Sequence, residues 1–224
     1  ADRKEGRTGA LSDRIAGIIL AWARAVREEC GPFRKLVGFF YGYGTELSGT
    51  PQYAQCGHLA LERLLASDDV DFICSPCQYG YRADQGALTH GSVLGAFADA
   101  ARMRGKLAFA EDDHRPPKVR TANHCLATRD RWHDEMFFRR NFVETMTHGR
   151  QQWWYSLGPR WMDEAWRQEI AGRLHRLGVE AMERDRSSAA EVAVVFDERS
   201  PAAMRFNRDL QRSLMLKTHE IGRA

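Results

Sequence analysis

The chain opens with an apolar stripe at helical spacing. Ser12 is a favourable N-cap residue, and apolar residues recur every three or four positions behind it until Gly31, where a helix would end. These apolar positions are Ile15, Ile18, Ile19, Trp22 and Val26. The short apolar run that follows, 35–41, predicts a buried strand. The pattern therefore begins with a helix followed by a strand.

The same alternation continues through the middle of the chain. Leu61, Leu64 and Leu65 predict a short helix, which an acidic turn separates from the next apolar run. The further predicted elements are a strand over 70–74, a helix over 92–104 that carries Val93, Leu94, Phe97 and Ala101 on one face, and a strand over 106–110. Gly105 is expected to end the helix before the last of these strands.

Two more strands and three more helices are expected in the second half. A helix over 129–148 would end at Gly149, with Trp132, Met136, Val143 and Met146 facing inward. The remaining predicted elements are a strand over 152–155, a helix over 162–184 with Trp166, Ile170, Leu174 and Leu177 aligned, a strand over 191–197 and a helix over 201–218.

Regular alternation of helices and strands predicts an α/β fold with a parallel sheet. Both an open doubly wound sheet and a (β/α)8 barrel fit it. No glycine-rich phosphate-binding turn of the GxGxxG or GxxxxGK[ST] type occurs, although a doubly wound nucleotide domain usually has one. Polar and aromatic residues follow the predicted strands instead, as they do at the active-site rim of a barrel.

Composition excludes several classes of protein. With 43% hydrophobic and 28% charged residues, the chain is typical of a globular protein, and a net charge of +3 without a basic tract gives no indication of nucleic-acid binding. The longest apolar run, 15–22, is too short to cross a bilayer. Five cysteines, an odd number, favour a reducing compartment, and the charged start is unlike a secretory signal. We therefore expect a cytoplasmic protein or a chain whose true beginning is absent.

Three carboxylates follow the strand predicted over 106–110. Glu111, Asp112 and Asp113 would place negative charge where a barrel opens, and like charges close together raise the pKa of at least one of them. A merely solvated acidic loop is an equal alternative. Glu46 is a second candidate rim carboxylate. Of the neighbours Trp153 and Trp154, strand alternation allows only one to line a pocket as a platform for a sugar.

A metal site is not expected. Cys74 and Cys77 have CxxC spacing, but tetrahedral zinc needs four ligands and no second pair accompanies them. His114, His124 and His133 are spaced too irregularly to lie on one helix face.

Several segments together resemble the catalytic barrel of β-galactosidase-like glycoside hydrolases of clan A, near glycoside hydrolase family 42. The residues that carry the likeness are the strings KLVGFFYGY at 35–43, GHLAL at 57–61, VDFICSP at 70–76 and GKLAFAEDD at 105–113. The likeness extends from about Leu11 to Phe196. It implies that Glu111, at the end of the family's seventh strand, is the nucleophile.

The resemblance also implies that the chain is part of a longer enzyme. Residues 1–186 would supply strands five to eight of the barrel, and 187–224 the beginning of a flavodoxin-like domain that forms oligomers in the family. A homo-oligomeric parent enzyme is therefore expected. The acid/base glutamate, which ends the fourth strand in that family, would lie upstream of residue 1.

The implied reaction is retaining hydrolysis of β-galactoside-like bonds, with two carboxyl groups about 5–5.5 Å apart and no metal or organic cofactor. Residues expected to bind a carbohydrate substrate or to orient Glu111 are Tyr43, Glu46, Tyr79, Arg82, Asp113, Arg115 and Trp154. Two other readings remain open. A barrel that lacks one catalytic carboxylate can be a carbohydrate-binding module without activity, and a doubly wound nucleotide-binding protein is the third.

Overall fold

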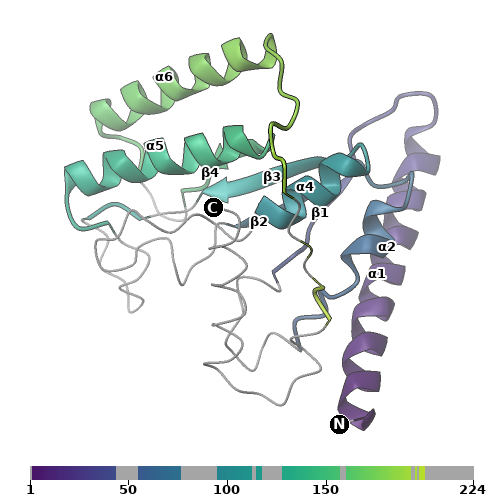
Figure 1. Ribbon diagram of the computed structural model, residues 1–224. Coiled ribbons are helices and arrows are strands. Elements are labelled where there is room, and N and C mark those ends of the chain that lie inside the picture. Colours follow the sequence, from purple (N-terminus) through teal and green to yellow (C-terminus); the bar gives the residue numbers. More distant parts are fainter. Residues whose placement is uncertain are drawn as a thin grey trace.

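The computed structural model describes residues 2–43, 55–76, 95–112, 115–117, 128–156, 160–192, 195 and 197–199. In chain order their elements are α1 (Asp2–Cys30), β1 (Gly38–Phe40), α2 (Leu61–Leu65), β2 (Phe72–Pro76), α4 (Gly95–Met103), β3 (Leu107–Asp112), α5 (Arg131–Thr147), β4 (Gln151–Trp154) and α6 (Ala165–Met182) (Figure 1). Helices and strands alternate, so the expected α/β pattern is confirmed.

The strands form one parallel sheet in the order β1-β2-β3-β4. In the described sheet, each strand therefore lies beside its neighbour in sequence, and the order nowhere reverses. A right-handed crossover between successive parallel strands places its helix on the same face each time. A doubly wound sheet needs a reversal to bring helices to both faces.

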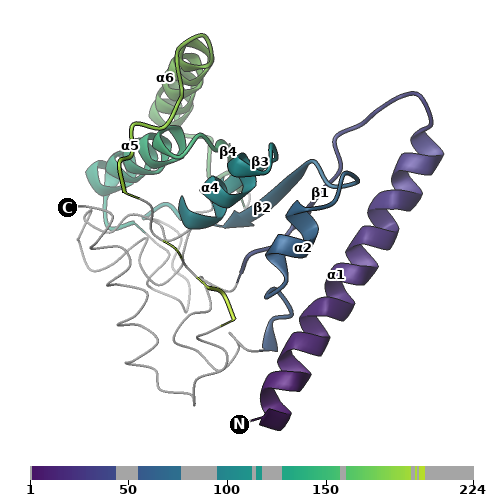
Figure 2. The same cartoon turned by 45° about the vertical axis from the view of Figure 1, so that its right-hand side comes forward.

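All five described helices pack on the same face of this sheet. Phe39, Ile73 and Ala108 are neighbours in the register of β1, β2 and β3, and they pack in one apolar cluster with residues of α1, α2 and α4. Trp154 lies beside Asp112 and packs against Phe138 of α5 and residues of α6. We call this side the helix-covered face. Figure 2 shows α1 and α2 at one end of it and α5 and α6 at the other.

Glycines end three of the described helices, as predicted. Gly31 follows α1, Gly105 follows α4 and Gly149 follows α5, and all have positive φ angles, 52°, 67° and 63°. A residue with a side chain is strained in this conformation, whereas glycine adopts it freely at the end of a helix. The position of each stop was visible in the sequence because it depends on a single residue type.

Ser12 is not an N-cap, contrary to our expectation. The first helix begins at Asp2, and Ser12 lies inside it, buried, with its hydroxyl oxygen accepting a hydrogen bond from the Leu59 backbone N–H. The predicted apolar stripe is only partly confirmed. Ile19 is buried and Ile15 packs against the same core, whereas Trp22 is 64% exposed and Ala16 and Ala23 are buried in its place. Small residues face the sheet and α2 because they allow close approach of the backbones.

The inward face of α5 differs from the prediction, because Trp132 is 59% exposed and Val143 is exposed. In α6 the predicted face is confirmed at Ile170 and Leu174, which are buried, and at Trp166, which packs against them, whereas Leu177 is exposed. The buried positions of α5 are His133, Asp134, Phe137, Phe138, Asn141 and Thr145. Four of these six buried residues are polar, and counting apolar residues therefore selected the wrong side of α5.

The prediction of a strand over 191–197 is wrong for the described residues of this segment. None of the described residues there, 191, 192, 195 and 197, belongs to a strand, and Val195 is 90% exposed. The helix expected over 201–218 lies outside the described residues. The division of the chain at residue 186 stays a prediction.

Candidate functional site

Two neighbouring carboxylates at the end of β3 point to opposite sides of the sheet. Glu111 pairs in register with Pro76 and Trp153, whereas Asp112 pairs with Trp154 on the helix-covered face. Both side chains are buried, Glu111 with 6% of its surface exposed and Asp112 with 2%. Strand alternation separates them, because successive side chains leave a strand in opposite directions. The acidic group therefore does not act as one cluster of like charges.

Glu111 shares its side of the sheet with large aromatic groups. Phe40 of β1 and Trp153 of β4 lie there, and their ring centroids are only 6.3 Å apart. In a flat sheet the three strand spacings between β1 and β4 would separate their backbones by about 14 Å. The contact shows the two rings converging over the middle strands, as side chains do on the inner side of a curved sheet. We call this side the concave face.

Cys74 lies at the centre of the concave face. The indole Nε1–H of Trp153 donates a hydrogen bond to its sulfur at 3.4 Å, across the intervening strand β3. Burial, aided by the negative charge of Glu111, raises the pKa of the Cys74 thiol to about 11, although the hydrogen bond from Trp153 and the charge of Arg150 act to lower it. The Glu111 carboxylate, the thiol and the indole are thus close neighbours. A thiol with this pKa is protonated and unreactive at neutral pH.

Other aromatic residues of the concave face pack against one another in pairs. Phe72 and Phe109 lie with centroids 4.9 Å apart, and Trp153 contacts Tyr155 at 5.1 Å. Phe72 also covers Gly38, where a Cβ atom would lie 2.3 Å from the ring. The face therefore combines one buried carboxylate with aromatic walls, which is the character of a binding surface for a molecule with both hydroxyl groups and flat apolar faces.

Trp154, the indole that we expected at the site, lies on the opposite side of the sheet from Glu111. Its ring packs against Phe138 of α5 at 5.9 Å. Together with Asp112 it borders a small pocket of about 10 Å³ on the helix-covered face, whose other lining residues are Phe138, Tyr155, Ser156, Trp161, Met162 and Arg167. Within the pair of tryptophans, Trp153 is the one beside Glu111.

Asp112 is held by hydrogen bonds from β4 and from the residue that follows it. The side-chain amide of Gln152 donates to its Oδ2 at 2.8 Å, and the Asp112 carbonyl accepts from the Tyr155 N–H at 2.8 Å. Behind the same pocket, Arg167 of α6 forms a buried ion pair with Asp134 of α5. Burial lowers the pKa of Arg167 to about 10, still well above neutral pH, so the pair remains charged. These contacts join β3, β4, α5 and α6 to one another.

Tyr43 lies beyond the end of β1 and contacts a histidine that we had assigned no catalytic role. Its backbone N–H donates to Nδ1 of His58 at 3.3 Å, and its ring meets the imidazole edge at 5.2 Å. The ring of Tyr41 stacks on the other side of His58 at 4.4 Å. Burial lowers the pKa of His58 to about 4, and the bond accepted by Nδ1 also favours the neutral ring. His58 is therefore uncharged at neutral pH.

Arg115 packs against the ring of Trp161, with 5.9 Å between its guanidinium carbon and the ring centroid. Its carbonyl accepts from both the N–H and the hydroxyl of Thr128. These contacts hold the residues at 115 and 128 together after the end of β3. Glu46, Tyr79, Arg82 and Asp113, the four remaining predicted site residues, lie outside the described residues, as does Cys77 of the CxxC pair.

The sequence indicated that only one of Trp153 and Trp154 shares the side of Glu111, because adjacent strand residues face opposite ways, but the register of β3 and β4 decides which one. The sequence contained no signal for the Cys74 contact, which depends on the sheet curvature.

Among the described residues, no group of three or more His, Cys, Asp or Glu side chains is placed to bind a metal ion. None of the helices in the described part of the chain has the length and apolar character needed to cross a membrane. Comparisons of the chain with protein-family models, curated proteins and solved structures found no match.

Proposed function

We propose that the chain is part of a retaining glycoside hydrolase in which Glu111 is the nucleophile. The observation that carries the proposal is the position of Glu111, near the carboxyl end of β3, on the concave face and beside the indole of Trp153. Active sites of parallel α/β barrels lie at the carboxyl ends of the strands. A nucleophilic carboxylate on the inside of such a barrel would meet a sugar held against aromatic side chains.

The sheet supports a partial (β/α)8 barrel more than a doubly wound domain. Its strand order does not reverse within the described residues, its helices pack on one face, and the opposite face brings Phe40 and Trp153 together. Closing the barrel requires four more strands, which would pair with the outer edges of β1 and β4. In this proposal they and the acid/base glutamate precede residue 1 in the complete enzyme.

In the proposed reaction, the Glu111 carboxylate attacks the anomeric carbon of a β-galactoside-like substrate. The bond to the leaving oxygen breaks as the upstream glutamic acid transfers its proton to that oxygen. The same upstream residue, now a carboxylate, then removes a proton from water, and the resulting attack releases the sugar from Glu111 with its anomeric configuration retained.

A covalent trap tests Glu111 directly. A 2-deoxy-2-fluoro galactoside with a dinitrophenyl leaving group needs little acid assistance, because that leaving group departs as a stable anion. We expect the peptide that contains Glu111 to gain the mass of the fluorosugar in the length-extended enzyme, and Glu111→Gln to abolish the gain. Asp112→Asn is the matched control, and it should leave the labelling intact because that carboxylate faces the helices. Labelling of another carboxylate would contradict the assignment.

The same protein separates hydrolase from carbohydrate-binding module. With aryl β-galactosides, the extended wild-type enzyme should release the phenol, and Glu111→Ala should remove the activity while leaving sugar binding measurable. Binding without turnover in the extended wild-type enzyme would favour the module.

A further inference from the structure

The segment after α6 returns along the molecule to its other end. Its described residues, 185–192, 195 and 197–199, are here called the strap. Near its beginning, Arg102 of α4 donates a hydrogen bond from Nη1 to the carbonyl of Arg186 at 3.3 Å. From there the strap runs past α4 toward the beginning of α2 (Figures 1 and 2). It therefore connects parts of the chain that are far apart in sequence.

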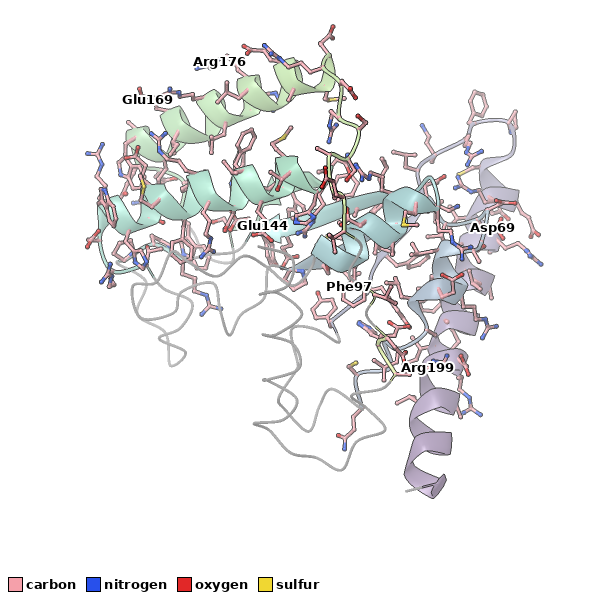
Figure 3. The ribbon with its side chains drawn as sticks, in the orientation of Figure 1. Asp69, Phe97, Glu144, Glu169, Arg176 and Arg199 are labelled. Atoms are coloured by element: carbon pink, nitrogen blue, oxygen red, sulfur yellow. The ribbon has the colours of Figure 1, made fainter. Side chains whose placement is uncertain are left out.

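At its far end the strap binds residues 57–61, here called loop 57–61, which are the residues that lead into α2 and the first residue of that helix. The Leu61 backbone N–H donates to Oε1 of Glu198 at 3.0 Å, and Nε of Arg199 donates to the Leu59 carbonyl at 3.0 Å. Arg199 also forms an ion pair with Asp13 of α1 at 3.1 Å. Figure 3 labels Arg199 where the strap meets α1. Two successive side chains thus hold one loop and one helix.

The other polar groups of this loop are bound by side chains of the main body. The Leu59 N–H donates to the Ser12 hydroxyl, while the Tyr41 hydroxyl accepts from the Ala60 N–H and donates to the Gly57 carbonyl. The strap completes this set, because Glu198 and Arg199 supply the partners of Leu61 and Leu59. A buried N–H without a partner would cost free energy, so removal of the strap would loosen the loop.

We propose that Glu198 and Arg199 make the strap a pH-sensitive clasp, which holds loop 57–61 when Glu198 is protonated and loosens when it ionises. The proposal is independent of the hydrolase assignment. It concerns the rim of the sheet, because the loop follows β1 at its carboxyl end and contains His58, which contacts Tyr43.

The charged and titratable groups around Glu198 come from four elements. Arg199 favours its ionised form, whereas Asp197 of the strap and Glu62 of α2 oppose ionisation. The hydroxyl of Tyr41 and the thiol of Cys56, after β1 and before α2, are close enough for the charge of Glu198 to raise their pKa values. Asp13 of α1 faces Arg199. Burial outweighs the hydrogen bond from Leu61 and the charge of Arg199, which both lower the pKa of Glu198, and raises it to about 7.

The direction of the pH effect follows from this shift. A released Glu198 has an ordinary pKa of about 4.5, so the docked state binds the proton more tightly. Docking is therefore strongest below that ordinary value and weakens as the pH rises through about 7. The pKa of His58 is about 4, so this side chain does not titrate in the upper part of the pH range over which docking weakens.

Amide hydrogen exchange of Leu61 in the 224-residue chain measures the clasp. After correction for the intrinsic exchange rate, we expect protection of this amide to fall by up to about 100-fold between about pH 5 and about pH 9, with nearly all of the fall below about pH 7. The Leu107 amide, which donates to the Asp71 carbonyl between β2 and β3, is the internal control and should not change.

Two variants identify the titrating group. Glu198→Gln keeps an oxygen acceptor that cannot ionise, so Leu61 should stay protected at every pH. Arg199→Ala should lower the protection throughout and keep a pH dependence. Constant protection of Leu61 in the wild type, or a wild-type pH profile in Glu198→Gln, would overturn the proposal.

Discussion

The two faces of the sheet treat buried polar groups in different ways. On the helix-covered face, Asp134 is neutralised by Arg167, and Asp112 accepts from Gln152, so each carboxylate joins elements together. On the concave face, Glu111 has a thiol and an indole among its neighbours, within a layer of aromatic rings. Adjacent residues in one strand therefore have different uses. The first face holds the fold together, whereas the second carries the carboxylate that we propose as the nucleophile.

This difference shows that adjacent acidic residues at the end of a strand can have different roles. Glu111 and Asp112 are chemically alike and adjacent in sequence, yet their burial has different consequences because they face different layers. Like-charge repulsion between them is reduced by the backbone that separates the two side chains. What matters for function is which of the two faces lacks helix packing in the described structure.

The largest expected effect is a loss of stability when the buried ion pair of the helix-covered face is broken. Arg167→Met removes one partner of the buried ion pair and leaves the Asp134 carboxylate with an uncompensated charge. We expect a loss of about 3–5 kcal/mol in the free energy of unfolding, measured by urea denaturation.

Arg139→Met is the matched control for that variant. Its ion pair with Glu135, at 2.7 Å within α5, is partly exposed, so the loss should be below about 0.5 kcal/mol. Equal losses in the two variants would contradict a structural role for the Arg167 pair.

A second prediction concerns the thiol on the concave face. Because the pKa of Cys74 is raised to about 11, we expect it to react with iodoacetamide near pH 8 about 100-fold more slowly than Cys30. Peptide mass spectrometry of the alkylated chain measures both rates. Cys30 is only partly buried and serves as the comparison within the same molecule. Comparable rates for the two thiols would show that Cys74 is open to solvent.

The smallest expected effect comes from crowding on the concave face. In Gly38→Ala the new Cβ atom would lie 2.3 Å from the Phe72 ring, which has to shift, so we expect a loss of about 1–3 kcal/mol by urea denaturation. Gly9→Ala is the control, since nothing lies within 4 Å of its Cβ position in α1 and the change favours the helix. Destabilisation by Gly9→Ala and none by Gly38→Ala would contradict the prediction that Phe72 crowds position 38.

The alternation of elements could be read from the sequence, as could the helix ends at Gly105 and Gly149, because these features depend on local preferences of the backbone. The faces of α1 and α5 could not. In α5 the buried side includes Asp134 and Asn141, and in α1 it includes Ser12, so apolar counting selected Trp132 and Trp22 instead. Asp134 and Ser12 have partners elsewhere in the fold, Arg167 and Leu59, and the chain around each residue does not reveal those partners.

For the candidate site, the sequence determined that a carboxylate follows a short apolar strand and that only one of two adjacent tryptophans can share its side. Local rules are sufficient for both statements, because a strand alternates its side chains whatever it packs against. The tertiary structure alone decided that Trp153 is the one, that Phe40 and Cys74 join it beside Glu111, and that the strap binds the loop before α2. These contacts bring together residues from distant strands, and their distances depend on the curvature of the sheet and the course of the chain around it.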